Sequence, residues 1–410
     1  MSIRSKLPHV GTTIFTVMSR RAQELGAINL GQGFPDYDID PRLGELVHEA
    51  MRSGHNQYAP MPGLPQLREA IALELARSHA VRFDPEQEIT VTLGATEAIF
   101  SAVQALVGPG DEAVVFDPAY DSYGPAIELA GGTCVHVPLS PPHFRYDWER
   151  VAAALNPRTR LLIVNSPHNP ACTCLAAQDV AALAALVRDR DLYVIADEVY
   201  EHLVFDARTH HSVLASAELR ERSIAVYSFG KTLHATGLRV GYAVAPAALT
   251  AELRKVHQFN TFTIATALQW AIARYLAERP QMGAQLAPFF AAKRDRFIAA
   301  LAGSDWSLTP AEGSYFQLID YGAISDAPDL QFADTVLRHA GVATIPLSVF
   351  YQKPPPMTLL RVCIAKRDET LADGAGRLLA FASAQAGGHR ASAGRAVADA
   401  DAGARAGSAS

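Results

Sequence analysis

The sequence predicts an α/β protein with a mainly parallel central sheet and a smaller α+β domain. Short apolar runs rich in β-branched residues recur from about residue 88 onward. Stretches with helical periodicity separate these runs, which is the pattern of a parallel sheet covered by helices on both faces. After residue 301 the pattern changes to two strand-like runs with one helix between them, and this predicts the smaller unit.

The individual elements follow from the same periodicities. The strands expected in the larger unit are residues 89–93, 112–116, 161–165, 192–197, 223–229 and 240–245. Helices are expected from about residue 95, after the Pro/Asn turn that follows 161–165, at 262–277, and at 285–301. In the smaller unit, strands 314–320 and 358–365 are expected on either side of a helix at 330–339.

These elements predict four regions. Residues 1–46, which are rich in turns, form an N-terminal segment that packs on the small domain, residues 47–290 form the large domain, and residues 291–385 form the small domain. Residues 386–410 are mostly Ala, Gly, Ser and charged residues, a composition that cannot build a packed core, so we expect a disordered tail.

Composition excludes several classes of protein. The chain has 410 residues, of which 49% are apolar and 19% charged, with a formal net charge of −6. No basic stripe for nucleic acid or membrane lipid is present, and no apolar run is long enough to span a bilayer. The N-terminus lacks a signal-peptide pattern, and four scattered cysteines do not form a disulfide framework, so we expect a cytoplasmic protein. No motif indicates a metal site.

Unusual polar residues follow the predicted strands at the edge where parallel sheets bind ligands. Gly94-Ala95-Thr96 opens a helix whose free N–H groups suit a phosphate, although the same residues also describe a tight turn and a helix cap. Asn169 lies between two prolines, Pro167 and Pro170, and a further asparagine, Asn165, comes four residues before it. Such a turn would hold the Asn169 amide fixed. Asp197 ends the most apolar strand, where it is either a helix cap or a buried acid that needs a cation.

Lys231 completes this set. It lies in "SFGKTLHATGLRVGY", between Ser228 and Arg239, without a charged neighbour from Ser223 to Leu238. A desolvated lysine near another cation has a lowered pKa, as a Schiff-base nucleophile requires, while serine and arginine suit a phosphate. Pyridoxal 5′-phosphate would satisfy all of these groups at once, because it has a phosphate, an aldehyde, a phenolic oxygen and a ring nitrogen.

The sequence also resembles the class I/II pyridoxal-phosphate aminotransferases of fold type I, in the branch of the methionine and kynurenine/glutamine aminotransferases. The resemblance extends to about residue 385. The motifs that carry it are "INLGQGFPDYD", "NQYAPMPGLPQLREAIA", "LGATEAIFSAVQALVGPGDEAVVFDPAYDSY", "NSPHNPA", "ADEVYEHLVFD", "SFGKTLHATGLRVGY" and "LLRVCIA". One departure is Ala171-Cys172, where many members have Thr-Gly, and this is expected to change the turn after Pro170.

The resemblance implies a role for each matching residue. Lys231 forms the internal aldimine and moves the proton in a 1,3 shift, and Asp197 pairs with the ring nitrogen. Asn169 and Tyr200 bind the phenolic oxygen, and Tyr120 stacks on the ring. The phosphate ligands implied are Ala95, Thr96, Ser228 and Arg239. Arg361 and Asn169 bind the substrate beside Gly33, and Tyr58 reaches the neighbouring active site of a homodimer.

The function implied is transfer of an α-amino group from a neutral amino acid to a 2-oxo acid. Methionine, aromatic amino acids, kynurenine and glutamine are the expected donors, because no second arginine is available for a side-chain carboxylate. A β-lyase that acts on cysteine conjugates or cystathionine remains an alternative, since it begins with the same proton abstraction. A non-enzymatic ligand sensor is a second alternative, although such regulators carry a winged-helix domain ahead of this fold.

Overall fold

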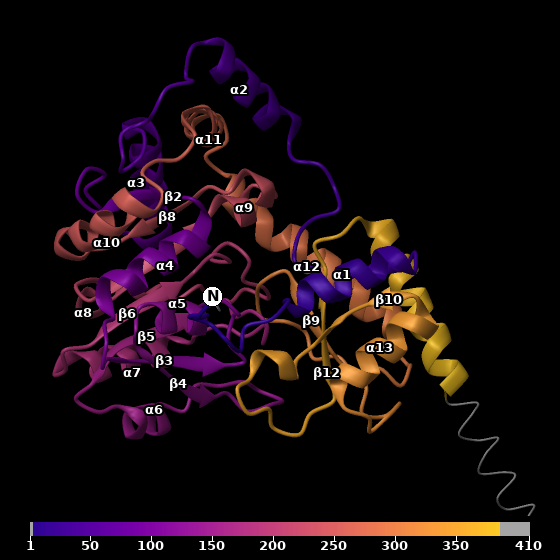
Figure 1. Ribbon diagram of the computed structural model, residues 1–410. Coiled ribbons are helices and arrows are strands. Elements are labelled where there is room, and N and C mark those ends of the chain that lie inside the picture. The colour runs from indigo at the N-terminus through magenta and orange to yellow at the C-terminus, as the bar shows by residue number, and fades with distance from the viewer. Residues whose placement is uncertain (1–2, 386–410) are drawn as a thin grey trace, which may run out of the picture.

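A seven-stranded sheet lies at the centre of the larger part of the molecule in the computed structural model, which describes residues 3–385 (Figure 1). Its strands, in spatial order, are β2 (Ile89–Thr92), β8 (Gly241–Val244), β7 (Ser223–Ser228), β6 (Tyr193–Asp197), β5 (Thr159–Asn165), β3 (Glu112–Asp117) and β4 (Thr133–Pro138). Strand β8 runs antiparallel to both of its neighbours, and the other pairs are parallel. The prediction of a mainly parallel sheet is therefore confirmed.

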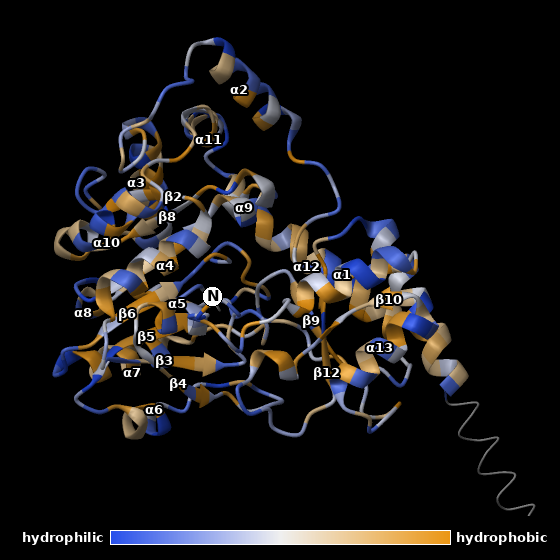
Figure 2. Ribbon diagram, in the orientation of Figure 1, coloured by the Kyte–Doolittle hydropathy of each residue, from blue (hydrophilic) through white to orange (hydrophobic). Residues whose placement is uncertain are grey.

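Both faces of this sheet are buried. In β3, β5 and β6, Val115, Ile163 and Ile195 enter one apolar cluster together with Ile99, whereas the neighbouring residues Val114, Leu162 and Val194 enter another. Successive side chains of a strand point to opposite faces, so these continuous apolar runs are explained by helices on both sides. The strands accordingly appear in hydrophobic colours in Figure 2, and the covering helices alternate between the two colours.

Helices connect these strands and cover the sheet. Several begin at residues suited to that position: Asp147 accepts from the Arg150 N–H at 3.0 Å, and Asp40 caps a helix that begins at a proline. The helices of this part are α2 (Pro41–Arg52), α3 (Pro65–His79), α4 (Gly94–Leu106), α5 (Tyr123–Leu129), α6 (Trp148–Ala154), α7 (Ala177–Arg188), α8 (Ala217–Arg220), α9 (Phe229–Thr232), α10 (Ala247–Asn260) and α11 (Thr266–Glu278). Short 3₁₀ turns occur at Val213–Ala215, Thr236–Leu238 and Ser348–Phe350.

A smaller group of elements lies to the right in Figure 1. It has an antiparallel sheet in the order β11 (Ile345–Pro346), β12 (Leu359–Cys363), β9 (Phe316–Asp320). The N-terminal part of the chain joins it, because β1 (Ile28–Asn29) pairs with β10 (Val342–Ala343) and Arg21 forms an ion pair with Asp334. The helices of this group are α1 (Ile14–Glu24), α12 (Met282–Leu301), α13 (Asp329–Ala340) and a helix from residue 368 to the end of the described chain.

The structure also differs from the sequence-based expectations in several elements. The elements that were not predicted include strand β4, helices α1, α2, α3, α5, α6, α8 and α10, and the helix from residue 368. The helix expected at residues 262–277 begins only at Thr266. The physical reason for the late start is Phe262, whose backbone has φ of 69° and ends α10. Among residues 3–385, no helix combines the length and the apolar character needed to cross a membrane. The four-region division stays a prediction, and its tail lies outside the described residues.

Candidate active site

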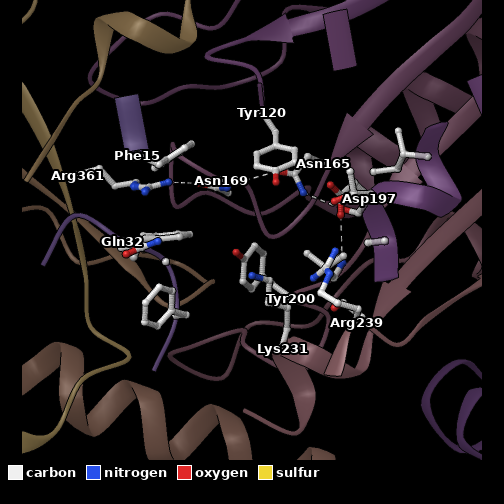
Figure 3. Close-up of a pocket in the computed structure, with 18 residues that line it drawn as sticks. Phe15, Gln32, Tyr120, Asn165, Asn169, Asp197, Tyr200, Lys231, Arg239 and Arg361 are labelled. Atoms are coloured by element: carbon white, nitrogen blue, oxygen red, sulfur yellow. Dashed lines mark hydrogen bonds between the residues drawn. The ribbon is translucent and has the colours of Figure 1, made fainter. Parts of the chain in front are cut away.

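One cavity of about 250 Å³ lies at the carboxyl edge of the sheet, between it and the smaller group of elements (Figure 3). It brings together residues from parts of the chain as distant as the N-terminal segment and β12. The predicted site residues that line it are Gly33, Ala95, Thr96, Tyr120, Asn169, Asp197, Tyr200, Ser228, Lys231, Arg239 and Arg361. Tyr58 does not: its side chain is 83% exposed and packs edge-on against Phe262, away from this cavity.

One side of the cavity is built by the start of α4. No side chain caps this helix at Leu93, so its first N–H groups are free for an anion. Gly94 has φ of 73°, and a Cβ placed there would lie 2.8 Å from Nη2 of Arg239. Only glycine permits this close approach of the guanidinium to the helix N-terminus. Ser228 ends β7 beside them, so an anion at this position would meet a cation, a hydroxyl and backbone donors.

Asp197 lies at the end of β6 and is buried. The Tyr123 hydroxyl donates to Asp197 Oδ2 at 2.6 Å, and the Val199 N–H donates to Oδ1 at 3.4 Å. Burial raises the pKa of Asp197 to about 6. Within residues 3–385 Asp197 has no ion-pair partner, so its charge is left for a cationic group of a ligand.

Lys231 lies in the short helix α9, directly after β7. Its Nζ donates to the Tyr315 hydroxyl at 2.6 Å, and it has no carboxylate partner among the described residues. Burial, and then the positive charges of Arg239 and Arg361, lower the pKa of Lys231 to about 8. A substantial fraction of this amine is therefore neutral near physiological pH.

Arg361 lies on β12 and is 1% exposed, which is unusual for an arginine without a carboxylate. Its Nη1 donates to Asn169 Oδ1 at 2.6 Å and its Nη2 to the Gly31 carbonyl at 3.0 Å, while its buried Nε has no partner. The guanidinium also lies 3.9 Å from the centroid of the Phe316 ring. A planar, partly unsatisfied guanidinium at an otherwise aromatic wall suits a carboxylate ligand.

Asn165, the last residue of β5, supports both Asp197 and Asn169. Asn165 donates through Nδ2 to the Asp197 carbonyl at 2.8 Å and accepts through Oδ1 from the Asn169 N–H at 2.7 Å. It thereby fixes Asn169 relative to the end of β6. At the sequence departure, Cys172 has φ of 62°, so the turn keeps a backbone conformation that favours glycine while it carries a cysteine.

Several residues of the site were not identified from the sequence. Asn165 belonged to a quoted motif but was assigned only a turn, and Tyr123 and Tyr315 had no motif role, because a tyrosine near an acid or lysine is visible only in the fold. The cavity-lining residues that carried no predicted role are Phe15, Gln32, Ile99, Asn165, Val199 and Phe316.

Comparisons with known proteins agree with this geometry. The profile of the family described as "Aminotransferase class I and II" matches residues 26–378. The chain is 50% identical over 375 residues to the methionine aminotransferase of Escherichia coli (strain K12), a match covering 92% of this chain and 97% of that protein. It is 31% identical over 388 residues to kynurenine–oxoglutarate transaminase 1 of mouse, covering 86% and 91%.

Solved structures give the same result. A crystal structure from Escherichia coli, with a methionine aminotransferase function, matches with a TM-score of 0.91 at 50% identity and covers 92% of this chain and 99% of that one. The N-succinyldiaminopimelate aminotransferase from Mycobacterium tuberculosis matches with a TM-score of 0.89 at 39% identity, covering 93% and 100%.

Together, the fold and a lysine, a buried acid and an anion-binding helix end at one sheet edge define a pyridoxal-phosphate-dependent aminotransferase of fold type I. The chain belongs to the family of class I and II aminotransferases, whose members use pyridoxal 5′-phosphate. The residues of the cavity fit this cofactor, because a free helix N-terminus, an acid without a cation and a lysine without an acid match its phosphate, ring nitrogen and aldehyde. The predicted family, enzyme class and cofactor are thus confirmed.

Proposed function

We propose that this aminotransferase takes the α-amino group from a neutral amino acid, with methionine as the first candidate, and transfers it to a 2-oxo acid. The buried Arg361 carries the proposal, since it offers one carboxylate site and, among residues 3–385, no second arginine lines the cavity apart from Arg239 at the opposite, proposed phosphate side. The wall near Arg361 is aromatic, with Phe15 and Phe316. The relatives named for methionine and kynurenine support a neutral donor.

The roles proposed for the cofactor ligands follow from their places in the cavity. Ala95, Thr96, Ser228 and Arg239 would hold the phosphate. Tyr120 would cover the ring, Asp197 would pair with the ring nitrogen, and Asn169 and Tyr200 would contact the phenolic oxygen. When bound, pyridoxal phosphate supplies an electron sink that makes the substrate α-proton acidic.

The protein groups would supply the remaining chemistry. Arg361 and Asn169 would orient the amino acid by its α-carboxylate, and the aromatic wall would exclude water from its side chain. Lys231 would hold and move the α-proton through Nζ, for which its lowered pKa is suited. Asp197 would keep a proton on the ring nitrogen.

The test is a panel of amino donors with and without a 2-oxo acid, together with the visible absorbance of the bound cofactor. We expect donor-dependent turnover only when the 2-oxo acid is present, and complete loss in Lys231→Ala. Lys255→Ala is the matched control, because Lys255 is exposed and pairs only with Glu252. Pyruvate release from cysteine conjugates without an acceptor would favour a β-lyase, and turnover by Lys231→Ala would contradict the assignment of Lys231.

The assembly proposed is a homodimer in which Tyr58 reaches the neighbouring phosphate site. The exposed edge-on pair of Tyr58 and Phe262 lies in an open groove, which supports a contact with a second copy. Mixing Tyr58→Phe with Lys231→Ala subunits tests this, because only the mixed dimer would regain one intact site. Activity no higher than the sum of the two parents would contradict shared sites.

We also propose a cytoplasmic location, which the free cysteines support. The proposed four-region division is supported by the β1–β10 pairing, which joins the N-terminal segment to the smaller group of elements.

A further inference from the structure

The amine of Lys231 has one hydrogen-bond partner in the structure, and that partner is a tyrosine. Lys231 Nζ lies 2.6 Å from the Tyr315 hydroxyl and 5.1 Å from the centroid of the same ring. The same hydroxyl lies 2.6 Å from the Gly33 carbonyl oxygen. Two hydrogen bonds thus connect Lys231 Nζ, the Tyr315 hydroxyl and the Gly33 carbonyl oxygen at the edge of the cavity. They join α9, the residue before β9 and the N-terminal segment.

The direction of both hydrogen bonds is fixed by chemistry. A carbonyl oxygen can only accept, so the single hydroxyl proton of Tyr315 is donated to Gly33. Towards Lys231, Tyr315 can then only accept. The hydroxyl therefore accepts from an N–H of the lysine and does not donate to the nitrogen lone pair. The neutral amine needs that lone pair to act as a base.

The backbone and neighbouring rings hold Tyr315 in this position. Ser314, the residue before it, has φ of 69°, a left-handed conformation that is costly for a residue other than glycine. A Cβ on Gly33 would lie 2.7 Å from Phe316 Cζ and 3.7 Å from Tyr315 Cε2, so a glycine is needed for this backbone to pack against the two rings. The Tyr200 ring lies edge-on to that of Tyr315, with centroids 5.0 Å apart. Strain of this kind next to a reactive group indicates a functional placement.

The other groups that face Lys231 act only through charge or ring contact. Asp197 on β6 favours its protonated form, whereas Arg239 and Arg361 disfavour it. Cys363 on β12 also lies nearby, but burial raises the pKa of its thiol, so it stays uncharged where Lys231 titrates. The Tyr200 ring lies 5.6 Å from Nζ. None of these groups forms a hydrogen bond with Nζ within residues 3–385, so the orientation of the free amine depends on Tyr315.

From this geometry we propose that Tyr315 is a positioning residue for Lys231: its hydroxyl, held in one direction by the Gly33 carbonyl, accepts an N–H of Lys231 and so holds the amine in position while it carries the substrate proton. This inference rests on the proposed role of Lys231 in transamination. Because the hydrogen bond uses an N–H in both protonation states, the lone pair of the neutral amine remains free for the substrate.

The test compares Tyr315→Phe with Tyr321→Phe. Tyr321 is also fully buried and donates to a backbone carbonyl, that of Ala327, but among the described residues it forms no hydrogen bond with Lys231. Labelling of the cofactor-free full chain with acetic anhydride at a series of pH values, followed by mass spectrometry, reports the midpoint at which Lys231 becomes neutral. Loss of the acceptor disfavours the protonated amine, so we expect this midpoint to fall in Tyr315→Phe and to stay unchanged in Tyr321→Phe.

In the holoenzyme, Tyr315→Phe should lower kcat about tenfold, the effect of one lost hydrogen bond, with a change in KM below about twofold. Gly33→Ala is a second variant, because its added methyl group would displace the Phe316 and Tyr315 pair; the same fall in midpoint is expected. The inference would be overturned if, in both variants, the labelling midpoint of Lys231 and the pH dependence of kcat in the holoenzyme stayed unchanged. Failure of the proposed function would instead appear in the unsubstituted enzyme, as absence of donor-dependent turnover.

Discussion

The Arg361 guanidinium donates to the Asn169 carboxamide oxygen at 2.6 Å, and this hydrogen bond joins the small sheet to the loop after β5. It also connects two proposed functions, because Asn169 is proposed to contact both the substrate carboxylate and the phenolic oxygen of the cofactor. A buried guanidinium normally requires a carboxylate to offset its desolvation. Here an amide oxygen, a backbone carbonyl and an aromatic ring surround it, and three of its five N–H groups form no hydrogen bond with the described residues.

The first prediction concerns Arg361→Ala. Loss of a buried, charged hydrogen-bond partner typically costs about 2–5 kcal/mol, so kcat/KM should fall by about 30-fold or more for every amino donor, mainly through KM. Steady-state kinetics with methionine, phenylalanine and alanine would measure this. Arg361→Lys is the matched variant, and it should recover only part of the loss because a lysine cannot bind a carboxylate in bidentate fashion. A loss confined to one donor would place Arg361 at the side-chain pocket instead.

The second prediction concerns pH and the cofactor-free enzyme. Burial lowers the pKa of Lys231 from its ordinary value of 10.5 to about 8, and only the neutral amine reacts with an aldehyde. The rate of pyridoxal phosphate capture should therefore rise about tenfold per pH unit below pH 8 and level off above it. The unfolded chain keeps this proton up to about pH 10.5, so the free energy of unfolding should also increase between pH 8 and 10.5. Stopped-flow absorbance measures the capture, and a rate that still rises beyond pH 9.5 would contradict a buried amine.

Much of this site could be predicted from the sequence, because its main residues follow strands. Asp197 and Ser228 end apolar runs that are buried on both faces, and the carboxyl ends of parallel strands meet at one edge. Polar residues in such places attract attention without a structure. The same logic correctly predicted six of the seven strands of the large sheet, all except β4.

The rest depended on tertiary contacts that no local pattern contains. Tyr123 and Tyr315 are ordinary aromatic residues until the fold brings one to Asp197 and the other to Lys231. Helix α10 was missed because two of the four residues that it buries at helical spacing, Thr250 and His257, are polar, and the positive φ of Phe262 that follows it depends on the loop around it. The position of Tyr58 relative to a second copy is likewise outside what one chain determines.

The third prediction separates two consequences of replacing a glycine that has positive φ, namely loss of stability and loss of cofactor affinity. Gly94→Ala and Gly110→Ala both place a Cβ on such a backbone, with φ of 73° and 93°, and both should lose about 1–3 kcal/mol of stability. Only at Gly94 would the Cβ meet Arg239, at 2.8 Å from Nη2; at Gly110 nothing lies within 4 Å. Affinity for pyridoxal phosphate, measured by fluorescence titration, should therefore fall at least about tenfold in Gly94→Ala alone. Equal affinities in the two variants would contradict the proposed role of Arg239 in the phosphate site.

Asp197 shows a conflict between stability and function. Burial raises the pKa of this carboxyl from 3.8 to about 6, because its hydrogen bonds from Tyr123 and Val199 do not offset the loss of water. In the cofactor-free protein the folded state thus binds this proton more tightly than the unfolded state does. The contribution to stability is unfavourable above pH 6 and disappears as the pH falls towards 4.

The fourth prediction follows from that sign. In the cofactor-free protein, Asp197→Asn should raise the free energy of unfolding at pH 8 by up to about 3 kcal/mol, since it removes a buried charge and keeps an acceptor for Tyr123. At pH 5 the difference should shrink, because the wild-type carboxyl is then mostly protonated. Cofactor affinity should change in the opposite direction, weakening at pH 8 since the amide cannot pair with a protonated ring nitrogen. Urea unfolding and cofactor titration at both pH values would measure the two effects. If Asp197→Asn were instead less stable at pH 8 with unchanged cofactor affinity, the carboxylate would be a structural cap and its proposed pairing with the cofactor would be wrong.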